Sequence, residues 1–265
     1  MARIKTVSLS PIQPGSKRLV EEEVLAGEIA GLEVLHVAIP AGRSFRISSA
    51  KGKGRVVIVL SGTGSLESGP WRQDLREVAL AVPRRSQWLQ LSAQTSVHII
   101  ELLVTFSEAD EDEKDFRRFS AAYPFFLPYS QCTTYSEKIK SPKTVNRTLL
   151  PENTFPRLCI GSVETTGPDR VGEHRHPMLE QLFLGLAENH CVVKADEEET
   201  PFAPYELIHI PLGSNHGVRV DEGNKLHYIW IDLFRTREDV SWIAQQHVAN
   251  PPPAPAAPGQ KKGDS

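Results

Sequence analysis

The sequence predicts an all-β protein made of two similar β-barrels, and three observations carry that prediction. Short apolar runs of strand length alternate with turn residues along the chain, which has 20 prolines and 18 glycines in 265 residues. No long segment shows the 3.6-residue periodicity of an amphipathic helix. The two halves also resemble each other, because in each a strand, a glycine-marked turn and another strand precede a proline that is followed five residues later by a large ring.

The expected strands are the apolar runs between these turns. In chain order they cover residues 34–40, 56–60, 78–82, 97–106, 158–163, 182–186, 207–211 and 226–234. Two short helices are also expected. The first follows the acidic run at residues 108–115, where Phe116, Phe119 and Tyr123 fall at helical spacing. The second begins at Thr236, a residue type that caps helices.

The internal similarity sets the expected domain organisation. The turn and the proline motif lie at residues 60–64 and 83–88 in the first half, and at residues 184–186 and 211–216 in the second. This pattern is typical of two copies of one barrel.

We expect three regions along the chain. Residues 1–125 form the first barrel and residues 126–249 the second. Residues 250–265 form a disordered tail, because a segment this rich in proline and alanine cannot bury enough apolar surface to order itself.

Composition narrows the classes of function. With 30 basic and 33 acidic residues the formal net charge is -3, so no overall field attracts nucleic acid or an anionic membrane, and the partner is expected to be a small molecule. The three cysteines are widely spaced and are expected to be buried thiols. The sequence shows no apolar stretch of the length that a signal peptide or a membrane span requires, which predicts a cytoplasmic protein.

Three histidines and a glutamate carry the pattern of a metal site. His174 and His176 are two residues apart, so in an extended chain both rings point to one face, and Glu180 has the same parity. The segment Pro211–His216 predicts a tight turn at the start of a strand, which brings His216 in as a fourth ligand. Three imidazoles and one carboxylate suit one divalent transition metal, namely Mn, Fe, Co, Ni or Zn. A vestigial barrel without metal is the alternative.

This pattern resembles the cupin superfamily. Its first motif is a glycine, then HisXHis, then a glutamate three or four residues on, and its second is ProXGlyXXHis; here these are Gly172 to Glu180, and Pro211, Gly213 and His216. The resemblance implies a bicupin of two jelly-roll barrels. The first barrel is expected to be degenerate and structural, because residues 45–54 contain no histidine and Trp88 stands where the last ligand belongs.

Among bicupins, the order of segments is similar to that of 4-deoxy-5-ketouronate isomerase and 5-deoxyglucuronate isomerase. The similar stretches are residues 146–148, 157–161, 216–218 and 228–230. The resemblance implies ketol isomerisation of a sugar or uronic-acid derivative, in which the metal chelates a carbonyl and its neighbouring hydroxyl and acidifies the proton between them. A non-haem iron dioxygenase and a non-enzymatic small-molecule-binding cupin are the alternatives, and exposed barrel edges favour a homodimer.

The last apolar run predicts part of the substrate pocket. Tyr228, Trp230 and Asp232 share one strand face, and the polar-tipped aromatics Tyr228 and Trp230 suit a carbohydrate. Met178, which lies between the metal ligands in sequence, is expected in the pocket wall. The catalytic base is left open among six residues, which are Glu173, His190, His209, His227, Tyr228 and Asp232.

Overall fold

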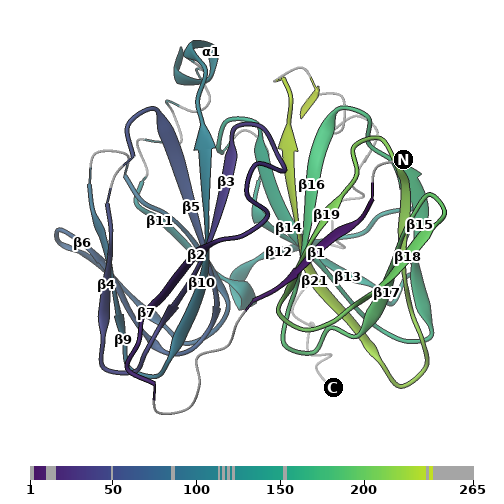
Figure 1. Ribbon diagram of the computed structural model, residues 1–265, viewed down its shortest axis with the longest axis horizontal. Helices are drawn as coiled ribbons and strands as arrows, with labels where there is room; N and C mark the ends of the chain where they lie inside the picture. Colours follow the sequence, from purple (N-terminus) through teal and green to yellow (C-terminus); the bar gives the residue numbers. More distant parts are fainter. Residues whose placement is uncertain are drawn as a thin grey trace, which may run out of the picture.

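The computed structural model contains two β-barrels that lie side by side, joined along one face of each (Figure 1). It describes residues 3–240 except 10–15, 49, 85–86, 113, 115–116, 118–119, 121–122, 152–153 and 237–238. The expected tail at residues 250–265 therefore lies outside the described residues. The prediction of an all-β protein is confirmed, since strands make up most of the described chain.

The first barrel is built from a six-stranded and a four-stranded antiparallel sheet. The six-stranded sheet has the order β11 (Phe125–Pro128), β8 (Ala79–Val82), β5 (Lys53–Ser61), β10 (Val97–Thr105), β3 (Leu32–Ile39) and β2 (Val20–Glu23). The four-stranded sheet has the order β4 (Ser44–Ile47), β9 (Leu89–Ala93), β6 (Gly64–Ser68) and β7 (Trp71–Leu75).

The second barrel repeats this construction. Its seven-stranded sheet has the order β1 (Lys5–Ser8), β19 (Glu206–Ile210), β16 (Leu179–Gly185), β21 (Lys225–Phe234), β14 (Leu158–Thr166), β13 (Val145–Leu150) and β12 (Thr133–Tyr135). Its four-stranded sheet has the order β15 (Asp169–Arg175), β20 (Asn215–Val220), β17 (Cys191–Ala195) and β18 (Glu198–Phe202).

Helices are short in the described part of the chain. They are α1 (Glu108–Asp112), at the expected acidic run, and the single 3₁₀ turn η1 (Tyr129–Gln131). Phe116 and Phe119, expected in the first helix, lie outside the described residues. Thr236 does accept the N–H of Asp239 on its hydroxyl at 3.4 Å, as a capping residue would. No described helix is long and apolar enough to cross a membrane.

Two edge strands cross the expected boundary at residue 125. The N-terminal strand β1 pairs with β19 of the second barrel, with Lys5 opposite His209, and in Figure 1 it lies among the strands of that barrel. Strand β11 pairs with β8 of the first barrel, with Phe125 opposite Val82. Each barrel's larger sheet is therefore completed by a strand from the sequence region assigned to the other.

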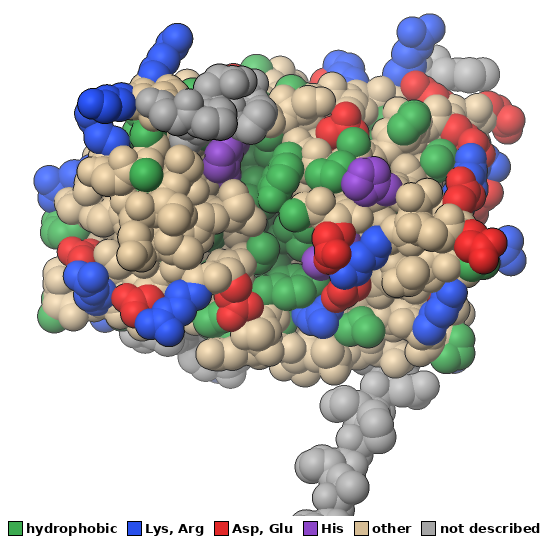
Figure 2. Space-filling model, turned by 90° about the horizontal axis from the view of Figure 1, so that it is seen from below, with side chains coloured by type: hydrophobic (Ala, Val, Ile, Leu, Met, Phe, Trp, Pro, Cys, Tyr) green, Lys and Arg blue, Asp and Glu red, His purple; other side chains and the backbone are tan. Residues whose placement is uncertain are grey.

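Alternation along the strands creates separate cores inside each barrel and between the two barrels. In β21, Ile229, Ile231 and Leu233 point into a cluster that also contains Ile58 and Leu102 of the first barrel, so the two larger sheets pack against each other. On the opposite face of β21, other side chains point into the second barrel. Figure 2 shows hydrophobic side chains gathered along the middle of the molecule, between the two halves. All three cysteines are buried and unbridged, as expected.

The first barrel holds an ion pair inside instead of a set of metal ligands. Arg55 Nε lies 2.8 Å from Glu101 Oε1, and both side chains share their strand face with the apolar core of this barrel. Trp88, which was expected to fill the barrel end, is only half-buried and lies under the guanidinium of Arg46, 4.5 Å from the ring centroid.

We expect Trp88→Ala to lower the free energy of unfolding by about 1–3 kcal/mol, below the roughly 3–5 kcal/mol of a fully buried ring. Urea denaturation measures this change, and the metal content of the variant should equal that of the wild type. A loss of metal at unchanged stability would contradict a structural role for the first barrel.

Candidate metal centre

Three histidines meet at one end of the second barrel. One nitrogen from each of His174, His176 and His216 lies within 4.8 Å of the other two, and no other such cluster of three potential ligands occurs among the described residues. The ring centroids are 4.5 Å apart for His174 and His216 and 4.7 Å apart for His174 and His176. The structure thus brings together three of the four ligands that the sequence predicts.

A β-bulge in β15 aims His174 into the barrel. Val171 lies opposite Val218 and His174 lies opposite His216, so the register shifts by one residue across Gly172 and Glu173. Val171 points into the barrel core, and strict alternation would turn residue 174 outward. The extra residue restores the inward direction, which is a known use of bulges beside functional sites.

A tight turn delivers His216 to the start of β20. The N–H of Ser214 donates to the carbonyl of Pro211 at 3.0 Å, and Gly213 has a φ of +73°. Only glycine adopts this left-handed conformation without strain, which explains its place three residues before the histidine.

The hydrogen bonds of the rings fit a metal. Nδ1 of His174 donates to the carbonyl of Gly172 at 2.8 Å, and Nδ1 of His216 donates to that of Ser214 at 3.2 Å. The bond at His216 leaves its Nε2 lone pair for a cation, and this Nε2 is buried with no hydrogen-bond partner among the described residues. Burial, helped by the neighbouring His174, lowers the pKa of His216 to about 4, so its ring is neutral, as a ligand must be.

Glu180, the expected fourth ligand, is not brought to the histidines. Its carboxylate lies 3.3 Å from Nε2 of His209 and 3.8 Å from Arg235. The parity argument fails because a turn at Pro177 and Met178 ends the extended chain, and the alternation restarts in β16. Glu180 thus shares a face with residues of β16 that pack between the barrels.

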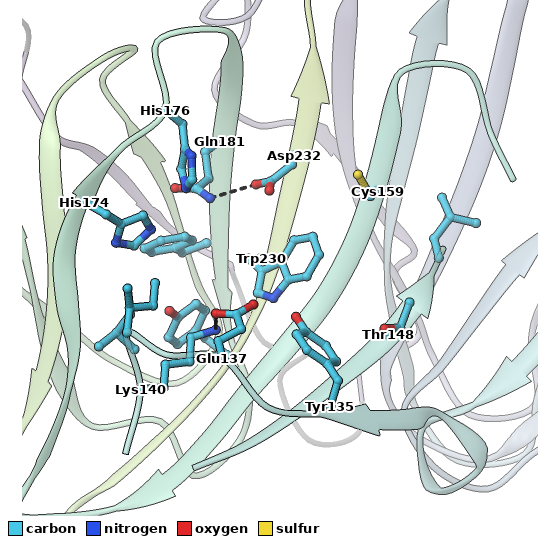
Figure 3. A pocket seen from close by; sticks show the side chains of 15 residues that line it. Tyr135, Glu137, Lys140, Thr148, Cys159, His174, His176, Gln181, Trp230 and Asp232 are labelled. Carbon is cyan, nitrogen blue, oxygen red and sulfur yellow. Dashed lines mark hydrogen bonds and ion pairs between the residues drawn. The ribbon is translucent and has the colours of Figure 1, made fainter. Parts of the chain in front are cut away.

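The next residue, Gln181, takes the inward position. It lines the same pocket as His174 and His176, and its Nε2 donates to Oδ1 of Asp232 at 2.8 Å (Figure 3). A glutamine at this position gives no sequence signal of a metal ligand.

A pocket of about 250 Å³ extends from the histidines into the barrel. Tyr228, Trp230 and Asp232 line it, as the alternation of the last strand predicts. Trp230 lies across Gly161, where an added Cβ would come within 2.2 Å of the indole, so the glycine makes room for the ring. Tyr228 is fully buried against Phe183, at 4.6 Å between ring centroids. A small polar ligand with an apolar face fits such walls.

A buried ion pair forms the polar wall of the pocket, and sequence reasoning missed it. Glu137 and Lys140 are joined at 2.7 Å (Figure 3). Lys140 also donates to Oδ1 of Asn146 at 2.8 Å. Burial lowers the pKa of Lys140, while the charge of Glu137 opposes that change. The backbone around Lys140 is held against β15 by an isolated antiparallel β-bridge between Lys140 and Val171.

The other residues named from the sequence lie elsewhere. Met178 is absent from the pocket lining and packs beside Cys159, Leu179 and Phe234. Of the six candidate bases, only Tyr228 and Asp232 line the pocket. The remaining four are engaged on other surfaces, where Glu173 pairs with Lys194, His209 with Glu28, and His227 with Tyr129, and His190 is exposed.

Comparison with known proteins identifies the fold. A cupin 2 conserved barrel domain protein from Leptotrichia buccalis superposes with a TM-score of 0.60 at 11% identity, covering 87% of this chain and 96% of its own. An IolB-like protein from Salmonella typhimurium gives 0.63 at 14% identity, with 84% and 94% covered. An oxalate decarboxylase from Bacillus subtilis gives 0.63 at 11% identity, with 88% and 77% covered.

The chain has the cupin fold. No family model matches the sequence, and no curated protein matches it either. The cupin fold here places the three histidines where two strands of the smaller sheet meet the mouth of the second barrel, which makes this barrel the candidate metal centre.

Proposed function

We propose that this cupin is a metal-dependent enzyme that catalyses ketol isomerisation of a small sugar or uronic-acid derivative in the second barrel. The observation that carries the proposal is the composition of one pocket, which joins a three-histidine cluster to a buried carboxylate and ammonium pair. Ketol isomerisation needs an electrophile at the carbonyl and a group that moves one proton between neighbouring carbons, and this pocket offers residues for both.

His174, His176 and His216 would hold the metal. A divalent transition metal bound there supplies Lewis acidity toward the carbonyl and hydroxyl of an open-chain substrate. His216 needs no proton loss to bind it, because burial and the neighbouring His174 already lower its pKa to about 4.

Glu137 is the proton carrier in this proposal. Its carboxylate takes the proton from the hydroxyl-bearing carbon beside the carbonyl and returns it to the former carbonyl carbon, while the hydroxyl proton passes to the former carbonyl oxygen. Lys140, at 2.7 Å, stabilises the ionised form of Glu137, and Asn146 holds Lys140 in place. Trp230 and Tyr228 exclude water and offer flat surfaces to the carbon face of a sugar.

The structural neighbours are compatible with a small polar substrate. The Bacillus subtilis neighbour is by its name an oxalate decarboxylase, which acts on a small anion in a two-barrel cupin of similar shape. The cavity of about 250 Å³ is at the small end for ligand sites, which also favours a small substrate over a polymer.

The test follows proton exchange under anaerobic conditions. Metal-loaded protein is incubated in D₂O with a panel of uronates, deoxyuronates and neutral sugars, and NMR measures loss of the C2 proton. We expect exchange and isomerisation with at least one member. Absence of exchange together with oxygen uptake would replace the proposal by a non-haem iron dioxygenase, and ligand binding without turnover would replace it by a binding protein.

The Glu137→Gln variant tests the proton carrier. We expect it to lower the exchange rate by about 10²-fold to 10⁴-fold, the usual contribution of general acid–base catalysis, at unchanged metal content. Glu173→Gln is the matched control, because this exposed carboxylate pairs with Lys194 outside the pocket. Equal exchange rates in Glu137→Gln and the wild type would remove Glu137 from the mechanism.

A further inference from the structure

We infer that the carbonyl oxygen of Gln181 is the fourth protein ligand of the metal, so that the centre is made of neutral donors and takes an anionic ligand. The inference rests on the metal centre of the proposed function, but it does not depend on isomerisation. It replaces the expected carboxylate of Glu180, which faces His209.

The orientation of the Gln181 amide is set by Asp232. A carboxylate can only accept hydrogen bonds here, so the atom 2.8 Å from Asp232 is the donor Nε2. The oxygen Oε1 then points the other way, and in Figure 3 the side chain stands between Asp232 and His176. Gln181 is 6% exposed, and Oε1 is buried with no hydrogen-bond partner among the described residues. A buried acceptor with no partner is costly, and a cation beside the histidines would satisfy it.

The geometry of the sheets supports the same conclusion. The three histidines come from β15 and the neighbouring β20 and from the residue just after β15, all on the smaller sheet's side of the barrel. Gln181 comes from β16 in the larger sheet, and β21 carries Asp232 directly opposite it. A donor from this second sheet closes the site from the opposite wall.

The charge of the centre follows from its donors. With three imidazoles and a carboxylate as donors, a site holding a divalent ion would have a net charge of +1. With three imidazoles and a neutral amide, its net charge is +2. In a buried site the ion is the largest local charge, so the neutral set favours an exogenous carboxylate over a neutral ligand. The inferred ligand class is a small carboxylate, which among the proposed substrates selects sugar acids over neutral sugars.

The experiment uses Co²⁺ as the metal, with acetate and its neutral counterpart acetamide as the added ligands. The visible spectrum of Co²⁺ reports both metal binding and a change of ligand, so activity is not needed. In the wild type we expect one Co²⁺ per chain, and we expect acetate to change the spectrum at a concentration at least about tenfold lower than acetamide does.

Two substitutions at position 181 separate the ligand role from a packing role. Gln181→Leu should weaken Co²⁺ binding at least about tenfold. Gln181→Glu should strengthen Co²⁺ binding and weaken acetate binding, each at least about tenfold. Because the new carboxylate would face Asp232, the double variant Gln181→Glu/Asp232→Asn is made in parallel to keep one hydrogen bond between the two side chains.

Glu180→Gln is the control, because it removes a carboxylate one residue away that contacts His209 instead. We expect it to leave Co²⁺ and acetate affinities within about twofold of the wild type. Wild-type Co²⁺ affinity in Gln181→Leu, or loss of Co²⁺ in Glu180→Gln, would overturn the inference while leaving the metal centre intact. Absence of Co²⁺ binding in the wild type would overturn the metal centre itself.

Discussion

The double variant His174→Ala/His216→Ala is expected to lose metal binding at the second barrel. Purified wild-type protein should carry about one divalent transition metal per chain. The two rings lie on paired strands with centroids 4.5 Å apart, and the Nδ1 hydrogen bond of His216 leaves its Nε2 for the metal. Removing both leaves the imidazole of His176 and the neutral amide of Gln181, which together cannot retain a transition metal through purification. Elemental analysis of both proteins measures the difference.

A thermal readout separates loss of ligands from loss of fold. Metal at about 100 times its dissociation constant stabilises the folded state by roughly 2.7 kcal/mol. For a chain of this size that raises the melting temperature by roughly 5–10 °C. The double variant should fold but show no such rise. His190→Ala is the control, because this histidine is exposed, away from the cluster. Equal metal content in the wild type and the double variant would place the site elsewhere.

The fold was predictable because alternation and turn chemistry are local. The last strand shows this most clearly, since Ile229 and Ile231 point between the barrels while Tyr228 and Trp230 point into the pocket, as a period of two requires. The three histidines were predictable for a similar reason, because the Gly213 turn fixes where the strand of His216 begins.

The structure does not bring Glu180 to the histidines, because the parity argument was carried through a break in the strand. The turn at Pro177 and Met178 restarts the alternation, so that Gln181 faces inward and Glu180 faces the other barrel. The bulge at Gly172 is equally invisible in a sequence pattern, and it turns His174 inward where strict alternation from Val171 would turn it outward.

The polar wall could not be predicted, because it depends on contacts between distant segments. Glu137 and Lys140 belong to a charged stretch that is typical of a solvated loop, and no motif surrounds them. Their burial follows from the backbone contact between Ile139 and Gly172, 33 positions further along the chain. The pairing of β1 with β19 and of β11 with β8 also joins segments that are far apart in sequence, and short-range sequence patterns cannot predict such pairings.

The largest stability effect is expected at this polar wall. Glu137 and Lys140 have side chains that are 11% and 7% exposed, so removing either partner leaves the other as a buried charge whose main counter-charge is gone. Lys140→Met and Glu137→Gln should each lower the free energy of unfolding by about 3–5 kcal/mol. The double variant Glu137→Gln/Lys140→Met should lose less than either single variant, because it leaves neither charge behind. Urea denaturation of the four proteins forms the double-mutant cycle.

The pH dependence of the stability of Glu137→Gln tests whether the buried charge of Lys140 causes the loss of stability. Burial already lowers the pKa of Lys140 in the folded wild type, and without Glu137 nothing of comparable weight opposes that shift. The unfolded chain, with an ordinary lysine pKa of about 10.4, then binds more protons than the folded chain, so the stability of the variant must rise with pH up to about that value. The deficit of Glu137→Gln relative to Glu137→Gln/Lys140→Met should therefore shrink as the pH is raised from 7 toward about 10. A deficit that is constant over this range would mean that the pKa of Lys140 in the folded variant is not lowered below that of the unfolded chain, and that the lost stability comes from packing alone.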